Sequence, residues 1–384
     1  METSRSVEIL ERLVGFPTLS RTPNTALLDF AEDILRRAGA TTERVRYQDG
    51  RENLYAVMGP ADRPPVLLSG HSDVVPVEGQ AWTKPPFSLT RAEGKLFGRG
   101  TADMKGFCAA AIAAMERAGQ HDLTTPLALA LSADEEVGCL GVHSLINVLR
   151  SAPVQPALVI VGEPTSMAVA TGHKGKTALR ATFQGRESHS ALAPMGLNAL
   201  HLAADFIGAI RRMQAEIEGS GHRDSDYDVP YTTLHAGKLS GGVALNIVPN
   251  EAVLDFEIRA VAEDDMAAII GQFREEAAAI AAATGDADAQ IQIEEVFAYP
   301  GLATSHTHEA VDFVKQLTGA NGTIKVAFGT DGGLFADALG VPVVVCGPGS
   351  MREGHRPDEF IAESEMSRCD AMLDQLIGRL KNGL

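Results

Sequence analysis

The sequence predicts an α/β protein in which a central, mostly parallel sheet carries an inserted smaller domain. Uninterrupted apolar runs recur at Val66–Leu68, Leu127–Leu131, Ala157–Val161 and Pro342–Cys346, which is typical of strands buried on both faces. From about residue 176 to 296 the pattern becomes β-α-β-β-α-β, the order of a ferredoxin-like unit. At 384 residues the chain is long enough for two domains. We therefore expect a discontinuous domain, 1–175 with 297–384, and an inserted domain, 176–296.

Helical spacing predicts helices over residues 6–15, 25–38 and 107–118, and a strand is expected over 53–58. Residues 76–99, rich in Pro and Gly and containing the only tryptophan, Trp82, are expected to form a loop. In the inserted domain the expected strands are 177–183, 232–239, 252–259 and 289–296, and the expected helices are 198–218 and 264–283.

Composition excludes several classes of protein. The formal net charge of −17 opposes nucleic-acid binding and is compatible with a cationic substrate or simply a soluble surface. No apolar run approaches the ~18 residues of a membrane span, and the N-terminus has no apolar signal region, so we expect a cytoplasmic protein. The cysteines, at 108, 139, 346 and 369, are too scattered for a disulfide framework or a thiolate zinc site.

Side chains that can bind metal ions follow the buried strands. The first run leads to His71, the second to Glu135 and Glu136, the third to Glu163, and the fourth is followed by His355. Because open α/β sheets keep their ligand sites at the carboxyl ends of strands, we expect these side chains to converge. Asp103, at the expected start of helix 107–118, is a further candidate.

Each candidate also has a simpler interpretation. His71 could be a core histidine, Asp103 a helix N-cap and Glu135 a surface acid. However, the three successive acids 134–136 would repel one another after a buried strand unless a cation compensated them. The recurrence of such residues after every buried strand favours a metal site.

Two imidazoles and three carboxylates suit Zn²⁺, with Co²⁺ or Mn²⁺ possible. One catalytic zinc usually takes about three protein ligands, so five ligands predict two ions that share a carboxylate. Neighbouring side chains of an extended chain face opposite ways, so one of Glu135 and Glu136 can bind metal while the other acts as general base in amide hydrolysis. Asp73 can accept the N–H of His71 and fix its tautomer.

The inserted domain offers three further polar candidates. His189 follows a strand and could donate to the oxyanion of a tetrahedral intermediate, although a loop histidine is usually just exposed. Asn246 and Arg259 could hold a substrate carboxylate, or could be a turn amide and a rim ion pair.

Five motifs together resemble the M20 family of metallopeptidases and amidohydrolases, over nearly the whole chain. They are SGHSDVVP (69–76), GRGTADMKG (98–106), DEE (134–136), GEP (162–164), and CGPGS (346–350) with HRPDEF (355–360). Within the family the sequence looks most like the acetylornithine deacetylases, a likeness that TGHKG (171–175) also carries.

The resemblance implies a zinc-peptidase-like catalytic domain with two metal ions. Its implied ligands are His71 and Glu163 for one ion and Glu136 and His355 for the other, with Asp103 bridging both. It also makes Glu135 the base and Asp73 the partner of His71, and it implies a cis peptide bond after Asp103. In this family the inserted domain is a lid that commonly forms a homodimer, and the position of His189 reaches the partner's active site.

One stretch departs from the family pattern. Residues 330–333 read TDGG where many acetylornithine deacetylases have Thr-Glu-Ala. We expect this stretch to line the substrate pocket, so Thr330 and Asp331 are candidate substrate-binding residues and the side-chain specificity stays open.

The sequence therefore predicts a Zn-dependent hydrolase of N-acyl-L-amino acids, with N-acetyl-L-ornithine of arginine biosynthesis as the favoured substrate. Another M20 activity is the nearer alternative: succinyl-diaminopimelate desuccinylase, aminoacylase or dipeptidase. A non-catalytic metal-binding dimer is the more distant one.

Overall fold

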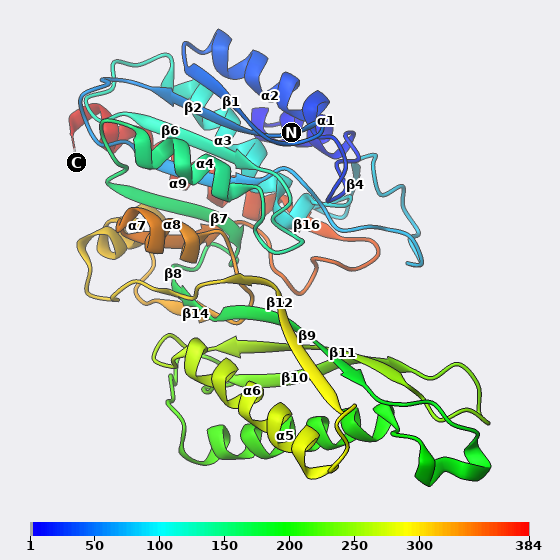
Figure 1. Ribbon diagram of the computed structural model, residues 1–384. Helices are drawn as coiled ribbons and strands as arrows, with labels where there is room; N and C mark the ends of the chain where they lie inside the picture. The colour runs from blue at the N-terminus through cyan, green and yellow to red at the C-terminus, as the bar shows by residue number, and fades with distance from the viewer. Residues whose placement is uncertain (1–2, 384) are drawn as a thin grey trace. The chain divides into compact units, whose positions relative to one another are not determined.

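The computed structural model describes residues 3–383, which fold into two compact units (Figure 1). The first unit contains the chain up to His173 and again from Leu302, and the second is Lys174–Gly301. The sequence predicts an insertion over residues 176–296. The structure extends it at both ends because strands β9 (Gly175–Gln184) and β12 (Gln290–Tyr299) begin and end outside that range.

A nine-stranded sheet forms the centre of the first unit, as far as the structure describes it. Its strands are β1 (Thr41–Gln48), β2 (Arg51–Met58), β3 (Val66–His71), β6 (Leu127–Ser132), β7 (Leu158–Pro164), β8 (Ala170–His173), β13 (Leu302–Ala303), β14 (Ile324–Val326) and β15 (Val343–Gly347). They lie in the order β1-β2-β6-β3-β7-β15-β8-β13, with β14 beside β8. The strands β6, β3, β7 and β15 pair in parallel, so their carboxyl ends meet at one edge of the sheet.

These four strands are buried along their whole length, as their unbroken apolar sequences predict. One apolar core contains residues of helices α1 (Arg5–Val14), α2 (Thr25–Arg37), α3 (Gly106–Ala118), α7 (Glu309–Thr318) and α9 (Glu363–Asn382). Helices α4 (Val142–Ser151) and α8 (Gly332–Leu339) pack against each other and against the sheet. The mixed α/β fold with a mostly parallel sheet is therefore confirmed.

Residues 76–99, predicted to be a loop, contain two short strands. Strands β4 (Thr90–Ala92) and β5 (Lys95–Phe97) form a hairpin, to which β16 (Phe360–Ala362) adds antiparallel to β5. Strands of three residues are too short to show the alternation of apolar and polar residues that predicts a strand, so the sequence did not indicate them. This small sheet holds the segment before residue 360 next to the segment that leads into the helical turn η1 (Thr101–Lys105).

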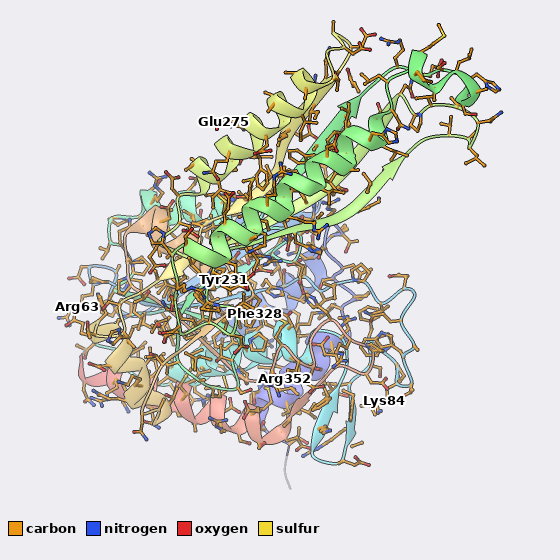
Figure 2. The ribbon with its side chains drawn as sticks, turned by 90° about the horizontal axis from the view of Figure 1, so that it is seen from below. Arg63, Lys84, Tyr231, Glu275, Phe328 and Arg352 are labelled. Atoms are coloured by element: carbon orange, nitrogen blue, oxygen red, sulfur yellow. The ribbon has the colours of Figure 1, made fainter. Side chains whose placement is uncertain are left out.

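The second unit has the predicted order of elements. Besides β9 and β12 it contains η2 (Ser190–Met195), α5 (Ala199–Ser220), β10 (Thr233–Gly241), β11 (Glu251–Ala260) and α6 (Met266–Ala283). Its antiparallel sheet has the order β10-β11-β9-β12. Phe206 and Phe273 of the helices pack against Phe183 and Phe256 of the sheet with ring centroids 5.1–5.7 Å apart. Figure 2 shows Glu275 on the exposed side of α6.

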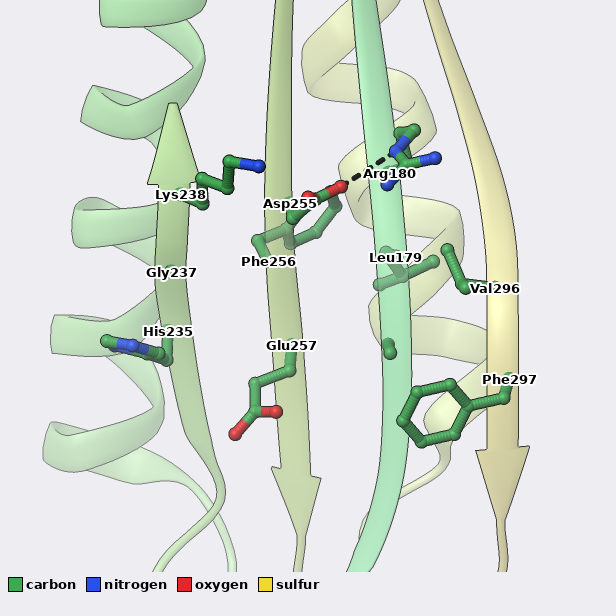
Figure 3. Close-up of a pocket in the computed structure, with 11 residues that line it drawn as sticks. Leu179, Arg180, His235, Gly237, Lys238, Asp255, Phe256, Glu257, Val296 and Phe297 are labelled. Carbon is green, nitrogen blue, oxygen red and sulfur yellow. Dashed lines mark hydrogen bonds and ion pairs between the residues drawn. The ribbon is translucent and has the colours of Figure 1, made fainter. Parts of the chain in front are cut away.

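The other face of this sheet carries charged side chains. Arg180 pairs with Asp255 at 2.7 Å across β9 and β11 (Figure 3). Lys176 pairs with Glu257 at 3.0 Å between the same two strands. The alternation of buried and half-exposed residues along β9 and β11 follows from one face meeting the helices and the other meeting solvent.

None of the described helices, which lie between Arg5 and Asn382, has the length and apolar composition needed to cross a membrane.

Candidate metal centre

Five side chains with metal-binding atoms lie at the carboxyl edge of the parallel strands. His71 ends β3, Glu136 follows β6, Glu163 lies in β7, Asp103 lies in η1, and His355 lies in the loop between β15 and β16. The candidate ligand atoms of His71, Asp103 and Glu136 all lie within 4.8 Å of one another, as do those of His71, Glu135 and Glu163. The two groups share His71, so they form one continuous cluster.

Asp103 lies between the two histidines. Its Oδ1 is 3.0 Å from Nε2 of His71, and its Oδ2 is 3.0 Å from Nε2 of His355. On one side, Glu163 Oε1 lies 3.7 Å from His71 Nε2, and on the other, Glu136 Oε2 lies 2.9 Å from His355 Nε2. The cluster therefore has two halves, and one oxygen of Asp103 faces each half.

Close packing of the backbone brings these side chains together. A Cβ added to Gly162 would lie 1.9 Å from the Phe107 ring, so only glycine lets α3 lie against β7 directly before Glu163. His355 has a φ of +60° and lies outside regular structure, whereas His71 is held in a fully buried strand. The Asp103–Met104 peptide bond is cis.

Burial and mutual repulsion dominate the electrostatics of the carboxylates. Burial, reinforced by the charge of Asp103, raises the pKa of Glu163 well above its usual value and the pKa of Glu136 to about 7. Burial and the nearby carboxylates of Asp331 and Glu136 also raise the pKa of Glu135. Acids crowded in this way are unfavourable as free anions.

The histidines compensate part of this charge. Burial opposes protonation of His71, but its hydrogen bond to Asp103 and the charge of Glu163 raise its pKa well above the usual value. Hydrogen bonds to Asp103 and Glu136 raise the pKa of His355 to about 10. Without a metal ion, the buried carboxylates are neutralised only by protons held on the neighbouring imidazoles. Divalent cations would stabilise these carboxylates better than the protonated imidazoles do. The residues therefore fit a pair of divalent ions.

Asp73 accepts from His71 through its backbone carbonyl, whereas the sequence predicts that its carboxylate accepts. The prediction of the carboxylate is therefore wrong. His71 Nδ1 donates to the Asp73 carbonyl at 2.9 Å, while the carboxylate oxygen is 3.6 Å away. The carboxylate instead accepts from the backbone N–H groups of Glu135 and Glu136, at 3.1 and 3.3 Å, and from the Ser20 hydroxyl at 2.8 Å. It is drawn away from the imidazole because these three donors use its oxygens.

A third polar group lies behind Glu135. The Cys139 thiol donates to Glu135 Oε1 at 3.4 Å, and ligand atoms of Glu135, Cys139 and Asp331 lie within 4.8 Å of one another. Asp331 is buried, accepts from the Ser132 hydroxyl at 2.8 Å, and has its pKa raised by burial to about 6. Thr330 is 0% exposed, and its hydroxyl accepts from the Gly332 N–H at 2.9 Å. In this structure Thr330 therefore stabilises the start of α8 and has no surface for the expected substrate contact.

The remaining candidates belong to the second unit. His189 precedes η2, and its Nδ1 accepts from the Ala191 N–H at 3.1 Å. The Ser190 N–H donates to the Asn246 carbonyl at 2.9 Å, so the segments that carry His189 and Asn246 are joined. Arg259 donates to Glu257 at 3.0 Å through Nε and to the Tyr299 hydroxyl at 3.2 Å through Nη1, so these two bonds fix the orientation of its guanidinium.

Comparison with known proteins extends over the whole fold. Residues 67–379 match peptidase family M20/M25/M40. An acetylornithine deacetylase from Pasteurella multocida (strain Pm70) is 30% identical over 98% of this chain and 98% of its own length.

Solved structures of M20 proteins have the same fold. An M20 family metallo-carboxypeptidase from Sulfolobus solfataricus superimposes with a TM-score of 0.79 at 17% identity, covering 98% of this chain and 99% of its own. A dinuclear metal-binding M20 peptidase from Bacillus subtilis gives a TM-score of 0.72 at 15% identity, covering 99% and 98%. With the family match spanning most of the sequence, this chain belongs to peptidase family M20/M25/M40.

Proposed function

We propose that this chain hydrolyses the amide bond of N-acyl-L-amino acids with the help of two divalent metal ions. The observation that supports this most directly is the position of Asp103, whose two carboxylate oxygens each lie 3.0 Å from Nε2 of a different histidine. A carboxylate placed in this way can be shared by two ions, as paired-metal hydrolases require.

Each half of the cluster would hold one ion. His71 and Glu163 would bind the first, Glu136 and His355 would bind the second, and Asp103 would bind both. Nitrogen and carboxylate donors favour Zn²⁺, and Co²⁺ or Mn²⁺ can use the same set. When bound, such ions polarise an amide carbonyl and lower the pKa of water.

Glu135 would carry the proton. Its carboxylate belongs to the same cluster as His71 and Glu163, and its backbone is fixed by the Asp73 carboxylate. In amide hydrolysis a carboxylate in this position accepts a proton from the attacking water and delivers it to the departing amine nitrogen. Asp73 would then orient both the base and, through its carbonyl, His71.

The second unit would supply substrate contacts. We assign His189 to the oxyanion and Asn246 and Arg259 to the substrate carboxylate. The assignment is supported by the M20 resemblance and by the hydrogen bond that joins the segments of His189 and Asn246. Asp331, buried beside Glu135, would influence which side chain is accepted without exposing a large surface of its own.

N-acetyl-L-ornithine is the substrate we propose, which would place the enzyme in arginine biosynthesis. The named deacetylase relative supports this choice, and the net charge of −17 is favourable for a cationic side chain. The test is a panel of N-acetyl-L-ornithine, other N-acetyl amino acids, N-succinyl-diaminopimelate and dipeptides, assayed on protein of known metal content. We expect the highest kcat/KM for N-acetyl-L-ornithine.

Other outcomes of the panel separate the alternatives. A clear preference for the succinyl compound or for dipeptides would overturn the substrate but keep the hydrolase. Folded protein that binds two ions and cleaves none of the panel would overturn the catalytic proposal.

We further propose a cytoplasmic homodimer formed through the second unit, as the family resemblance implies. Light scattering on the purified chain should then give about twice the 40.6 kDa mass of one chain. A mass of one chain at assay concentration would contradict the dimer.

A further inference from the structure

Arg99 and Glu359 form an ion pair that is enclosed within the first unit. Arg99 Nη1 lies 2.6 Å from Glu359 Oε2, and the two side chains are 0% and 1% exposed. Taking two charges out of water carries a cost that their attraction rarely exceeds, so stability alone explains such a pair poorly. Neither residue belongs to the five candidate ligands or to the proposed proton path.

Glu359 holds the backbone of Asp103. Its second oxygen, Oε1, accepts from the backbone N–H groups of Ala102 at 2.9 Å and Asp103 at 3.2 Å. The backbone is held a second time where the Gly98 N–H donates to the Glu359 carbonyl at 2.9 Å. The position of the shared carboxylate is therefore tied to Glu359.

Arg99 continues the connection toward His355. Its Nη2 donates to Gln80 Oε1 at 2.5 Å, and Gln80 Nε2 donates to the backbone carbonyl of His355 at 2.9 Å. Trp82 contacts both Gln80 and Arg99. Its Nε1 donates to Gln80 Oε1 at 3.0 Å, and the centre of its ring lies 5.0 Å from the Arg99 guanidinium. A continuous chain of hydrogen bonds thus runs from Asp103 through Glu359, Arg99 and Gln80 to His355.

The two halves of the cluster differ in how much they need this connection. His71 and Glu163 lie in neighbouring buried strands, β3 and β7, whose register is fixed by the sheet. His355 lies in a loop with its side chain 47% exposed, and in the described residues no strand or helix holds it. Metal ligands need support to within about 0.5 Å, so the loop ligand depends on whatever fixes its backbone.

We propose that Arg99, Glu359 and Gln80, here called the brace, are positioning residues that set His355 against Asp103 and thereby control binding of one of the two ions. This inference rests on the proposed function, because it takes both residues as metal ligands. It goes beyond that function in predicting an asymmetry. Loss of the brace should weaken the ion at Glu136 and His355 more than the ion at His71 and Glu163, because both ions share Asp103 but only the second also depends on the loop ligand His355.

The test is a titration of metal-free full-length protein with Co²⁺, followed by calorimetry and by the visible spectrum of the bound ion. The main variant is Arg99→Met combined with Glu359→Gln, because removing both charges leaves no unpaired ion in the interior. Gln80→Ala is a milder second variant that keeps the ion pair. Glu32→Gln is the matched control, since Glu32 also pairs with an arginine, Arg44 at 2.9 Å, but on α2 and β1.

We expect wild type and Glu32→Gln to bind two ions with the same affinities. The double variant should bind the second ion roughly 10–100-fold more weakly, the usual effect of removing support from a metal ligand, and the first ion with a smaller loss that reflects only the shared Asp103. Gln80→Ala should shift the second ion in the same direction by a smaller factor.

Two results would overturn the brace while leaving the proposed function intact: unchanged affinity for the second ion in both brace variants, or equal weakening of both ions. A wild-type protein that binds fewer than two ions would instead remove the proposed function, and the brace with it. The two failures are therefore distinguishable.

Discussion

The carboxylate of Asp73 accepts the backbone N–H of Glu135 at 3.1 Å, although the two residues are 62 positions apart. The same residue accepts His71 Nδ1 through its carbonyl at 2.9 Å. One aspartate therefore fixes a candidate ligand with its main chain and the candidate base with its side chain. This arrangement makes Asp73 a good subject for substitution.

Asp73→Ala should lower kcat/KM by roughly 10–100-fold, because Glu135 and Glu136 would lose the acceptor that orients their backbone. Ser20→Ala removes only one of the three donors to Asp73 and should have a smaller effect. Steady-state kinetics on N-acetyl-L-ornithine at fixed metal content compares them. Equal rates for Asp73→Ala and wild type would contradict the positioning role.

Glu135→Gln should lower kcat by about 10²–10⁴-fold while the bound metal stays at the wild-type level, since the amide cannot carry a proton. Glu136→Gln is the contrasting variant, because it should lose metal as well as activity. Elemental analysis of both purified variants, beside the kinetics, separates a base from a ligand. A Glu135→Gln enzyme with near wild-type kcat would show that another group moves the proton.

Removal of metal should lower the melting temperature of the wild-type protein. An ion present at 100 times its Kd stabilises the folded state by about 2.7 kcal/mol, and a chelator abolishes this contribution. Calorimetry with and without a chelator measures the shift, and added Zn²⁺ should restore it. The melting temperature of Asp103→Asn should change much less when the chelator is added. If the chelator leaves the wild-type melting temperature unchanged, the cluster does not hold a stabilising metal ion.

Gly162→Ala should destabilise the first unit by about 1–3 kcal/mol, because the new Cβ would overlap the Phe107 ring at 1.9 Å. Gly378→Ala is the matched control in α9, where an added Cβ meets nothing within 4 Å. Alanine there should stabilise the protein by about 0.5–1 kcal/mol through its better helix propensity. Urea unfolding of both variants tests the pair; opposite signs are expected, and equal effects would show that packing before Glu163 is loose.

Much of the fold could be predicted because the local pattern of apolar residues indicates where the buried strands and helices lie. The unbroken apolar runs of β3, β6 and β7 signal buried parallel strands, and the parallel order puts their ends at one edge. Strand β1 escaped prediction because its sequence, TTERVRYQ, offers no apolar face, and the strand is half-exposed along its length. It forms a strand because it pairs with β2, which is a tertiary effect.

Tertiary contacts also explain which parts of the candidate site could not be predicted from the sequence. Strand ends pointed to His71 and Glu163, but no local signal shows that Arg99 meets Glu359, 260 positions away. The sequence shows only that Arg99 is a charged residue between two glycines, Gly98 and Gly100, and this does not identify its partner. The burial of Thr330 was equally invisible, since a threonine after a glycine also suits an exposed turn.

Strand β15 pairs with β7 in the sheet, yet it follows the whole second unit in the chain, and His355 comes later still. During synthesis on the ribosome, the half of the cluster at His71 and Glu163 can therefore form long before its counterpart leaves the exit tunnel. In the proposed function, the second metal ion would therefore bind only near the end of synthesis, and the nascent chain would not be active before then.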